Sequence, residues 1–398
     1  MGRLASVGVE LEQAQKLWQP QPGWLNTASY GLPPDPAWEA LQEALAGWRA
    51  GRMSWERWGE STEQSRAAFA RLVGVPAVDV AVGATVSQLL APVAAALPAG
   101  ARVVVPEVEF TSNLFPWLVQ EDRGVEVRTV PLAELATSID ADTDLVAFSL
   151  VQSADGTVAA YDDIVAAARA YGALVAVDAT QACGWLPFDA ARADVVVAGG
   201  YKWLMGPRGT AFGYLTPALR DRLRPDAAGW FAGRDPHAAY YGPPLRLADD
   251  ARRFDISPAW FSWVGAAPAL ELLLEIGVPA VHAHDVALAN RFLTGLGQPP
   301  GDSAIVTVQV PGAQEKLERA GVRAAVRAGK VRASFHLYST EQDVDLALDA
   351  LTSVPRRQPG RAPRHPDQRA SPIVGPAPGR PDQRASPGLG RPDRPAAP

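Results

Sequence analysis

The lysines of this chain are few, and one of them has unusual neighbours. The 37 basic residues include only these lysines: Lys16, Lys202, Lys316 and Lys330. Lys202 stands between Tyr201 and the apolar run 203–205, a setting in which a charged side chain is costly. Desolvation lowers the pKa of a lysine and frees its amine, which is how a Schiff-base lysine is prepared. The alternative is a lysine whose stem packs on apolar groups while its ammonium stays in water.

An aspartate upstream of Lys202 is a candidate partner for it. Asp178 follows the apolar run 174–177, and an acid at the carboxyl end of a parallel strand points into the crevice where open sheets bind ligands. The alternative is that Asp178 caps the next turn. Pyridoxal phosphate needs both groups, an amine for its aldehyde and a carboxylate that keeps its pyridine nitrogen protonated. Gln181 is then expected to donate a hydrogen bond to the ring 3-oxygen.

A phosphate site is expected where residues 82–87 open an apolar helix that runs to about Leu97. The first backbone N–H groups of a helix and a nearby hydroxyl bind anions, which makes Ala84 and Thr85 the candidates. Thr85 as a plain helix cap is the alternative. The hydroxyl of Tyr201 is expected to reach the same phosphate.

The elements that must position these residues follow from the pattern of apolar runs. Between about residues 75 and 215, short apolar runs alternate with helical stretches, such as the helix expected over 161–171. The expected strands cover residues 102–105, 125–130, 144–151, 173–177, 194–197 and 210–215. Strands separated by helices predict an α/β fold with a mostly parallel sheet covered on both faces.

Three regions are expected along the chain. Residues 1–265 comprise a mostly helical N-terminal segment, 10–73, and a large domain. Residues 266–354 form a smaller α/β domain with strands at 304–310 and 331–337. Residues 355–398 contain 12 prolines and nine arginines against three aspartates, and they nearly repeat one octapeptide. Such a segment buries too little apolar surface to fold, so we predict a disordered tail.

Composition narrows the function classes further. The formal net charge is −6, and the basic tail leaves the body more acidic still, which argues against nucleic acid as the partner. No window reaches the roughly 18 apolar residues of a membrane span, and the N-terminus lacks a signal-like apolar stretch. A single cysteine, Cys183, fits a reducing cytoplasm and excludes an intrachain disulfide. The five histidines show no metal-binding spacing.

The motifs together resemble a known family. Residues 177–181 (VDATQ), 200–203 (GYKW) and 206–209 (GPRG) are similar to those of fold-type I pyridoxal-phosphate enzymes of the class V aminotransferase group. That group includes cysteine desulfurases, isopenicillin N epimerase-like proteins and kynureninase, and the resemblance covers roughly residues 20–352. It implies a fold-type I transferase with a large, mostly parallel-sheet domain and a smaller C-terminal α/β domain.

The resemblance also implies roles for single residues. Lys202 would form the imine, Asp178 would pair with the pyridine nitrogen, and Thr85 would bind the phosphate. Phe110, in the segment 109–117, is the nearest ring to stack on the cofactor, although Thr111 is the other candidate for that position and Phe110 alternatively packs in the core.

Further roles come from three other segments. Arg332 resembles the arginine that clamps a substrate carboxylate, the alternative being a surface arginine at a strand start. Asn26 lies in a segment, 25–31, that resembles one reaching the active site. Ser257 lies in a segment, 253–258, that resembles a loop lending a hydroxyl to the phosphate of a neighbouring subunit, and this resemblance implies a homodimer with shared sites.

Two departures from the desulfurase pattern affect the expected reaction. The stretch 322–330, where desulfurases carry a nucleophilic cysteine, has none, and Tyr201 replaces the histidine that precedes their lysine. Cys183 is expected to be a small buried residue instead. We therefore predict an enzyme acting at the α carbon of a small amino acid through a Lys202 Schiff base, of aminotransferase type. An epimerase or a C–S lyase of the same family is the alternative, and a catalytically silent binding protein on the same fold is a third.

Overall fold

A seven-stranded sheet forms the centre of the molecule. The computed structural model describes residues 11–327 and 329–353. The strands are β1 (Val80–Gly83), β2 (Arg102–Pro106), β3 (Glu126–Val130), β4 (Leu145–Ser149), β5 (Leu174–Asp178), β6 (Val195–Gly199) and β7 (Ala211–Leu215). Their order is β1-β7-β6-β5-β4-β2-β3, and only β7 runs against its two neighbours. The predicted mostly parallel sheet is confirmed, and β1, which was not expected, closes one edge.

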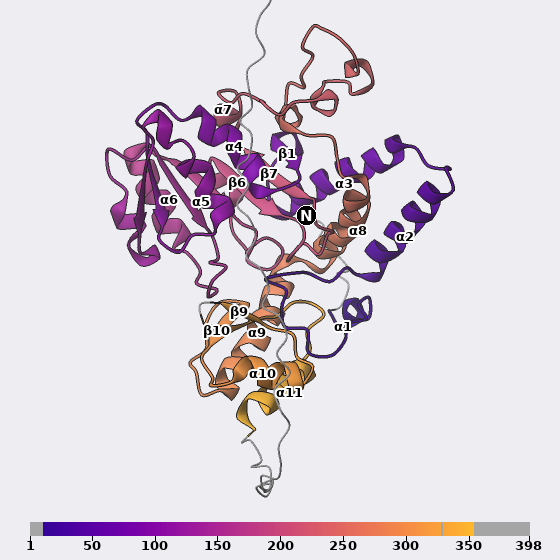
Figure 1. Ribbon diagram of the computed structural model, residues 1–398, viewed down its shortest axis with the longest axis vertical. Coiled ribbons are helices and arrows are strands. Elements are labelled where there is room, and N and C mark those ends of the chain that lie inside the picture. The colour runs from indigo at the N-terminus through magenta and orange to yellow at the C-terminus, as the bar shows by residue number, and fades with distance from the viewer. Residues whose placement is uncertain (1–10, 328, 354–398) are drawn as a thin grey trace, which may run out of the picture. The chain divides into compact units, whose positions relative to one another are not determined.

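Helices cover both faces of this sheet, because side chains of successive strand residues point to opposite faces. Val175 and Val177 of β5 pack with one apolar cluster and Ala176 with another. The first cluster includes α3 (Trp55–Val73), α6 (Tyr161–Tyr171) and α8 (Trp260–Ile276), and the second includes α4 (Val86–Ala96), α5 (Thr111–Leu118) and α7 (Pro217–Arg220). Figure 1 shows these helices around the central strands. Every strand except the edge strand β3 is therefore largely buried, as a two-sided parallel sheet requires.

The N-terminal segment is helical, as expected. It contains α1 (Leu11–Gln15) and α2 (Asp35–Arg49) before α3, and α2 packs on α8. Between the first two helices the chain runs beside the smaller sheet described next, and Asn26 forms an isolated parallel bridge with Ser334 of that sheet.

A second, smaller sheet follows α8. It has the order β8-β10-β9, with β8 (Ile305–Val308), β9 (Ala325–Arg327) and β10 (Lys330–Ser334), all antiparallel. The helices α9 (Val278–Gly295), α10 (Ala313–Arg319) and α11 (Glu341–Thr352) pack with it around one apolar cluster, drawn in orange and yellow in Figure 1. The two expected strands of this region are present, and the short β9 is an addition.

The predicted domain boundaries remain predictions. The boundary at 265/266 falls inside α8, which packs on α2 and α3 of the large-sheet region. The predicted tail, 355–398, lies outside the described residues.

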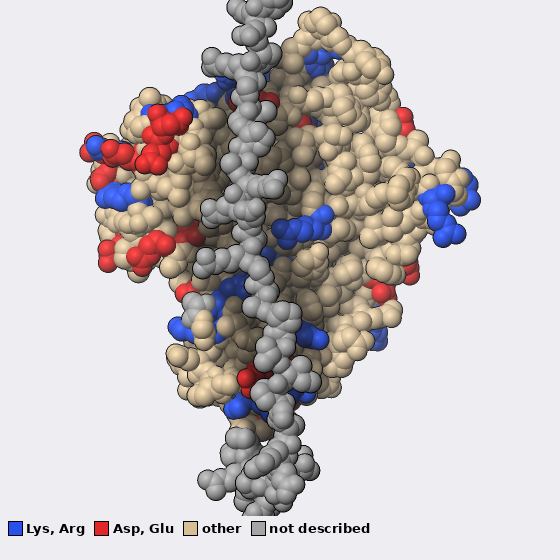
Figure 2. All heavy atoms as spheres, in the orientation of Figure 1, with Lys and Arg blue, Asp and Glu red and all other residues tan. Residues whose placement is uncertain are grey.

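Charge and hydropathy of the described part add two observations. On the face drawn in Figure 2, acidic side chains gather at the left, over the region of α5 and α6. Within the described ranges no single helix is long and apolar enough to span a membrane; the bent pair α8 and α9 meets that test only jointly.

Candidate active site

Lys202 lies in a turn that follows the carboxyl end of β6. Its side chain is 6% exposed, and Nζ is 5.5 Å from the ring centroid of Phe110 and 5.7 Å from that of Tyr201. Nζ makes no hydrogen bond to any other residue of the described chain. Burial lowers the pKa of Lys202 to about 8; Asp178 opposes this shift, and Arg332 adds to it. The amine is therefore available as a free base close to neutral pH.

The turn that holds Lys202 is tightly constrained. Met205 adopts a left-handed φ of 55°, which is unusual for a residue with a side chain. Its N–H donates to the carbonyl of Lys202 at 3.1 Å, and the N–H of Gly206 donates to the carbonyl of Gly200 at 2.8 Å. A Cβ on Gly31 would lie 1.9 Å from the carbonyl oxygen of Lys202, so only glycine allows the N-terminal segment to approach this turn.

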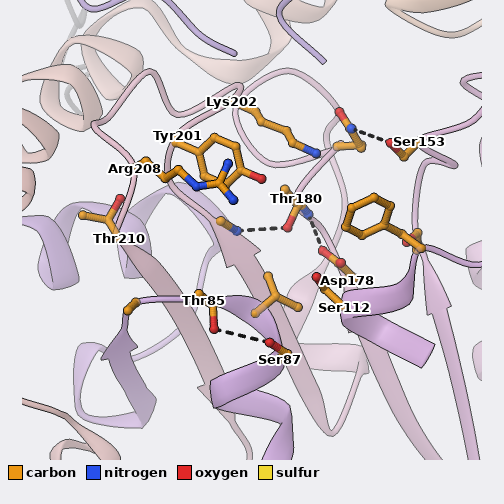
Figure 3. Close-up of a pocket in the computed structure, with 16 residues that line it drawn as sticks. Thr85, Ser87, Ser112, Ser153, Asp178, Thr180, Tyr201, Lys202, Arg208 and Thr210 are labelled. Atoms are coloured by element: carbon orange, nitrogen blue, oxygen red, sulfur yellow. Dashed lines mark hydrogen bonds between the residues drawn. The ribbon is translucent and has the colours of Figure 1, made fainter. Parts of the chain in front are cut away.

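Asp178 is the last residue of β5 and faces the same pocket as Lys202 (Figure 3). The side chain is 4% exposed, and Oδ1 accepts a hydrogen bond from the N–H of Thr180 at 2.8 Å. The other oxygen, Oδ2, accepts none from the residues that the structure describes. Burial raises the pKa of Asp178, while the hydrogen bonds of Thr180 and the charge of Lys202 oppose the rise. A buried carboxylate with one unused oxygen is suited to a cationic N–H group of a ligand.

The opposite side of the pocket is formed by the start of α4. Thr85 is the N-cap, and its Oγ1 accepts a hydrogen bond from the N–H of Gln88 at 3.2 Å. Ser87 Oγ lies 3.4 Å from Thr85 Oγ1, and both side chains line the pocket (Figure 3). The N–H of Ala84 donates to Gln88 Oε1 at 2.8 Å, so in this structure the side chain of Gln88 uses that donor. The amides of the first helical turn, with the two hydroxyls, offer an anion site.

Arg208 is a pocket residue that sequence reasoning did not select. Its guanidinium carbon is 4.7 Å from the ring centroid of Tyr201, and Figure 3 shows it lying against that ring. Among the described residues that line the pocket, only Arg208 and Lys202 are cationic. The motif 206–209 was recognised in the sequence, but nothing in it indicated that the arginine would turn toward the pocket.

The structure shows the surroundings of Gln181 and Phe110, the residues predicted to contact the ring of the cofactor. Gln181 lines the pocket, but its Nε2 already donates to Ala28 O at 3.0 Å and to Ser153 Oγ at 3.1 Å. A bond from Gln181 to a ligand oxygen would therefore replace one of these. Phe110 lines the pocket and Thr111 does not, which favours Phe110 as the stacking ring.

Most of the predicted residues come together in this pocket, and three do not. Those lining it are Ala84, Thr85, Phe110, Asp178, Gln181, Tyr201 and Lys202. Arg332 is 1% exposed; its Nη1 donates to Ser153, a lining residue, and its Nη2 donates to Ser29 Oγ at 2.8 Å. Burial lowers the pKa of Arg332 to about 10, and Arg327 adds to this shift.

Asn26 and Ser257 are the other two residues outside the pocket. Asn26 is beside β10, and its buried Oδ1 has no partner among the described residues. Ser257 is exposed and lies after the short helix Ala251–Phe254. The role predicted for Ser257 involves a second copy of the chain, so it stays a prediction.

Sequence reasoning also missed several small polar residues of the pocket. These are Ser87, Ser112, Ser149, Ser153, Thr180 and Thr210. They come from the first turns of α4 and α5 and from the ends and loops of strands, and isolated serines and threonines give no pattern in a sequence.

The residues present fit pyridoxal phosphate. The buried amine of Lys202 suits its aldehyde, the unused oxygen of Asp178 suits its ring nitrogen, and the start of α4 with Arg208 suits its phosphate. Phe110 offers an aromatic face between these groups. The pocket thus provides one complementary group for each functional part of the cofactor.

Comparison with known proteins gives the same assignment. Residues 43–315 match the family model described as aminotransferase class V. The chain belongs to this family. It is a pyridoxal-phosphate enzyme, and the fold expected from the sequence is confirmed.

Individual relatives differ in the reactions that their names give. The chain is 30% identical over 351 residues to an uncharacterized aminotransferase, YcbU, of Bacillus subtilis, covering 83% of this chain and 93% of the relative. It is 27% identical over 337 residues to isopenicillin N epimerase of Streptomyces clavuligerus, covering 73% and 84%. A solved cysteine desulfurase from Thermococcus onnurineus superposes with a TM-score of 0.72 at 22% identity, covering 82% and 93%, and supports the fold.

Proposed function

We propose that this class V enzyme acts at the α carbon of a small amino acid, with Lys202 as its base, and that its reaction is of aminotransferase type. The observation that supports this most is the buried amine of Lys202, with its pKa lowered to about 8, in one pocket with the carboxylate of Asp178. Bound pyridoxal phosphate supplies an aldehyde that combines with amines and a ring that takes up the electrons of the Cα–H bond.

Different residues of the chain hold different parts of this cofactor. Asp178 keeps a proton on the ring nitrogen through its unused oxygen, because a buried carboxylate strongly stabilises a cationic N–H. Thr85, the first amides of α4, and Arg208 bind the phosphate, with Tyr201 orienting Arg208 through its ring. Phe110 would pack against the ring of the bound cofactor.

Lys202 then moves the proton of the substrate. With a pKa near the working pH, its amine would accept the proton from the substrate Cα, and the resulting ammonium would be the proton donor for the cofactor carbon that transamination requires. Arg332 binds the substrate carboxylate in this proposal. It contacts Ser153 of the pocket wall, and its fork geometry matches a carboxylate.

One feature of the pocket favours transamination over epimerisation. Inversion at Cα is simplest with a second proton donor on the face opposite Lys202. The lining residues that can titrate, among those the structure describes, are Asp178, Tyr201, Lys202 and Arg208. Asp178 is assigned to the ring nitrogen, and Tyr201 and Arg208 to the phosphate region, which leaves Lys202 as the one assigned base for the substrate. A single base that moves a proton along one face is sufficient for transamination. An epimerase or a C–S lyase of the same family is the alternative.

Formation of a persulfide on the enzyme is disfavoured. Cys183 is 2% exposed, and burial raises the pKa of its thiol well above the usual range, which keeps it protonated and unreactive. The segment 322–330 contains no cysteine.

The assembly and its location are part of the proposal. We expect a homodimer in which the exposed Ser257 serves the phosphate site of the second copy, and in which Asn26 contacts the substrate. The single cysteine of the chain is compatible with a reducing cytoplasm.

The reaction is tested by incubating the full-length holoenzyme with a panel of L- and D-amino acids. The proposal predicts release of a keto acid, with conversion of the cofactor from its aldehyde to its amine form, for at least one amino acid. Exchange of the α hydrogen with inversion would contradict transamination and indicate the epimerase alternative. Release of a thiol and ammonia together with a keto acid, while the cofactor stays in its aldehyde form, would indicate the lyase alternative. No reaction with any amino acid, in a protein that binds the cofactor, would indicate the silent binding protein.

A further inference from the structure

A buried histidine–aspartate pair lies behind the active site, on the side of the smaller sheet. His336 follows β10, and Asp285 belongs to α9; both side chains are 0% exposed. His336 Nδ1 is 2.9 Å from Asp285 Oδ2. On its other side, His336 Nε2 is 2.9 Å from the backbone carbonyl oxygen of Trp203, the residue directly after Lys202.

This geometry fixes one hydrogen of the imidazole. The carbonyl of Trp203 can only accept, so His336 Nε2 carries a hydrogen, and a proton lies between Nδ1 and Asp285 Oδ2. The groups that surround the pair are His282 and His284 on α9 and the ring of Tyr338, 5.7 Å from that of His336. Asp285 Oδ1 is buried and has no partner in the described chain. The carboxylate therefore depends on His336 for its stabilisation.

The carbonyl that His336 binds is one of three in succession on the lysine turn. The carbonyl of Tyr201 accepts from the N–H of Gly31 at 3.0 Å, and that of Lys202 accepts from the N–H of Met205 at 3.1 Å. The carbonyl of Trp203 accepts from His336. Each carbonyl is thus held by a different partner: the N-terminal segment, the turn itself and the region of the smaller sheet.

Hydrogen bonds of the Trp203 side chain connect the lysine turn to the pocket wall. Trp203 is fully buried, and its Nε1 donates to Gln181 Oε1 at 2.8 Å. Gln181 in turn donates to Ser153 Oγ, which also accepts from Arg332. A displacement of Trp203 would therefore move both Lys202 and the residues beside it.

We propose that His336, held by Asp285, is a positioning residue for Lys202: it clamps the carbonyl of Trp203 and so sets where the lysine amine stands in the pocket. His336 does not line the pocket, so it acts through the turn and not on the substrate. The inference rests on the proposed role of Lys202 as the reacting amine.

Two substitutions at the same position separate this role from a merely structural one. The amide nitrogen of asparagine overlays Nδ1 of histidine, so His336→Asn keeps a donor for Asp285 and loses the bond to Trp203. The amide nitrogen of glutamine overlays Nε2, so His336→Gln keeps the bond to Trp203 and leaves Asp285 without its partner. A structural role predicts that the glutamine variant is the worse of the two, because it exposes an uncompensated buried carboxylate. The positioning role predicts that the asparagine variant changes the reactivity of Lys202 more than the glutamine variant does.

The readouts follow Lys202 itself. In the full-length holoenzyme, the pH midpoint of the visible absorption of the lysine-bound cofactor is measured. In the same chain freed of cofactor, competitive labelling with an amine reagent, followed by peptide mass analysis, gives the reactivity of Lys202 relative to exposed Lys330. His284→Gln is the matched control, since His284 neighbours Asp285 but contacts Ser339 O, away from the lysine turn.

We expect His336→Asn to lower kcat about 10- to 100-fold with KM changed less than about threefold, because small misplacements of a reacting group have effects of this size. The labelling of Lys202 shifts in pH midpoint by about one unit in His336→Asn, and by less than half of that in His336→Gln and His284→Gln. Unchanged Lys202 labelling in a folded His336→Asn protein would overturn the inference. So would a larger Lys202 effect in the glutamine variant. If the holoenzyme showed no lysine-bound cofactor, the proposed function would fail, while the labelling comparison would still test the clamp.

Discussion

Two buried aspartates of the described chain, Asp255 and Asp178, each lie near a strongly basic side chain, and the two sites use their charges in opposite ways. Beside β1, Arg66 and Asp255 are 3% and 0% exposed, and Arg66 Nη2 is 2.6 Å from Asp255 Oδ2. Arg66 also donates to the carbonyl of Val80, and Asp255 Oδ1 accepts from the N–H of Val82 at 2.8 Å. In the pocket, Lys202 and Asp178 are also buried, at 6% and 4% exposed, but do not bond to each other.

The difference separates a group that stabilises the fold from one that is available for chemistry. Both oxygens of Asp255 have protein partners, so the pair fixes β1, which leads into the turn before α4. Asp178 leaves one oxygen unused, and Lys202 leaves its amine unused, in the part of the chain that the structure describes. Groups of this second kind destabilise the fold slightly and acquire partners only from a ligand.

The largest effect is expected for Lys202→Ala. Loss of the base lowers kcat by about 10⁴-fold, the upper end of the range for general base catalysis. The melting temperature stays equal or rises, because an unpaired buried amine is removed. Steady-state kinetics and thermal unfolding measure both, with Lys330→Ala, at an exposed lysine, as the control. A substantial loss of stability would show that Lys202 stabilises the fold, as Arg66 is expected to do.

Arg66→Met is expected to show the opposite pattern. It leaves Asp255 buried and unpaired, which lowers the free energy of unfolding by about 3–5 kcal/mol, while kcat of the folded fraction changes little. The double variant with Asp255→Asn should recover part of the loss, because the uncompensated charge is gone. Denaturant unfolding measures the first effect, and a kcat loss as large as that of Lys202→Ala would contradict the distinction.

The pair beside β1 also predicts a pH dependence. Burial raises the pKa of Asp255 to about 6, with Arg66 opposing the rise. As pH falls, the folded protein therefore binds this proton before the unfolded chain does. The contribution of Asp255 to stability is fully present below pH 4 and is lost as pH rises through 6. The deficit of Arg66→Met should accordingly shrink between pH 7 and pH 5; a deficit that grows on acidification would contradict the assignment.

Asp178→Asn is expected to lower kcat about 10²- to 10³-fold. The amide is nearly isosteric but carries no charge to keep a proton on the ring nitrogen of the cofactor. Because burial raises the pKa of Asp178, removing its charge should leave thermal stability unchanged or slightly higher. Steady-state kinetics and thermal unfolding measure these two effects. A variant with wild-type kcat would remove Asp178 from the proposed mechanism.

The smallest effect in this series is expected for Arg208→Gln. One charge-assisted contact to the phosphate is lost, which weakens cofactor binding about tenfold. Titration of the cofactor-free protein, followed by absorption, gives the Kd, and Arg224→Gln at a distant exposed arginine is the control. Equal affinities of the two variants would show that Arg208 does not contact the phosphate.

Local features of the sequence predicted the sheet and the centre of the site. The strands are short apolar runs. Asp178 ends β5, and Lys202 lies in the turn after β6, which is the parallel neighbour of β5, so their meeting follows from parallel pairing. The Thr85 turn was predictable because an apolar helix follows it at once.

Features that depend on packing between distant segments were not predictable. Asp285 and His336 lie on separate elements, and each alone is an ordinary polar residue. Arg208 turns toward the pocket because the ring of Tyr201 supports it, which no spacing rule indicates. The two acceptors of the Gln181 amide lie 153 and 28 positions away in the sequence, so these hydrogen bonds could not be predicted either.

The most direct test of the central claim is to locate the cofactor on the chain. Full-length protein loaded with pyridoxal phosphate is reduced with borohydride, digested and analysed by mass spectrometry. We predict that the reduced cofactor is attached to the peptide containing Lys202, and that the Lys202→Ala variant shows no attached cofactor. Attachment to Lys16, Lys316 or Lys330 instead, or no attachment at all, would contradict it.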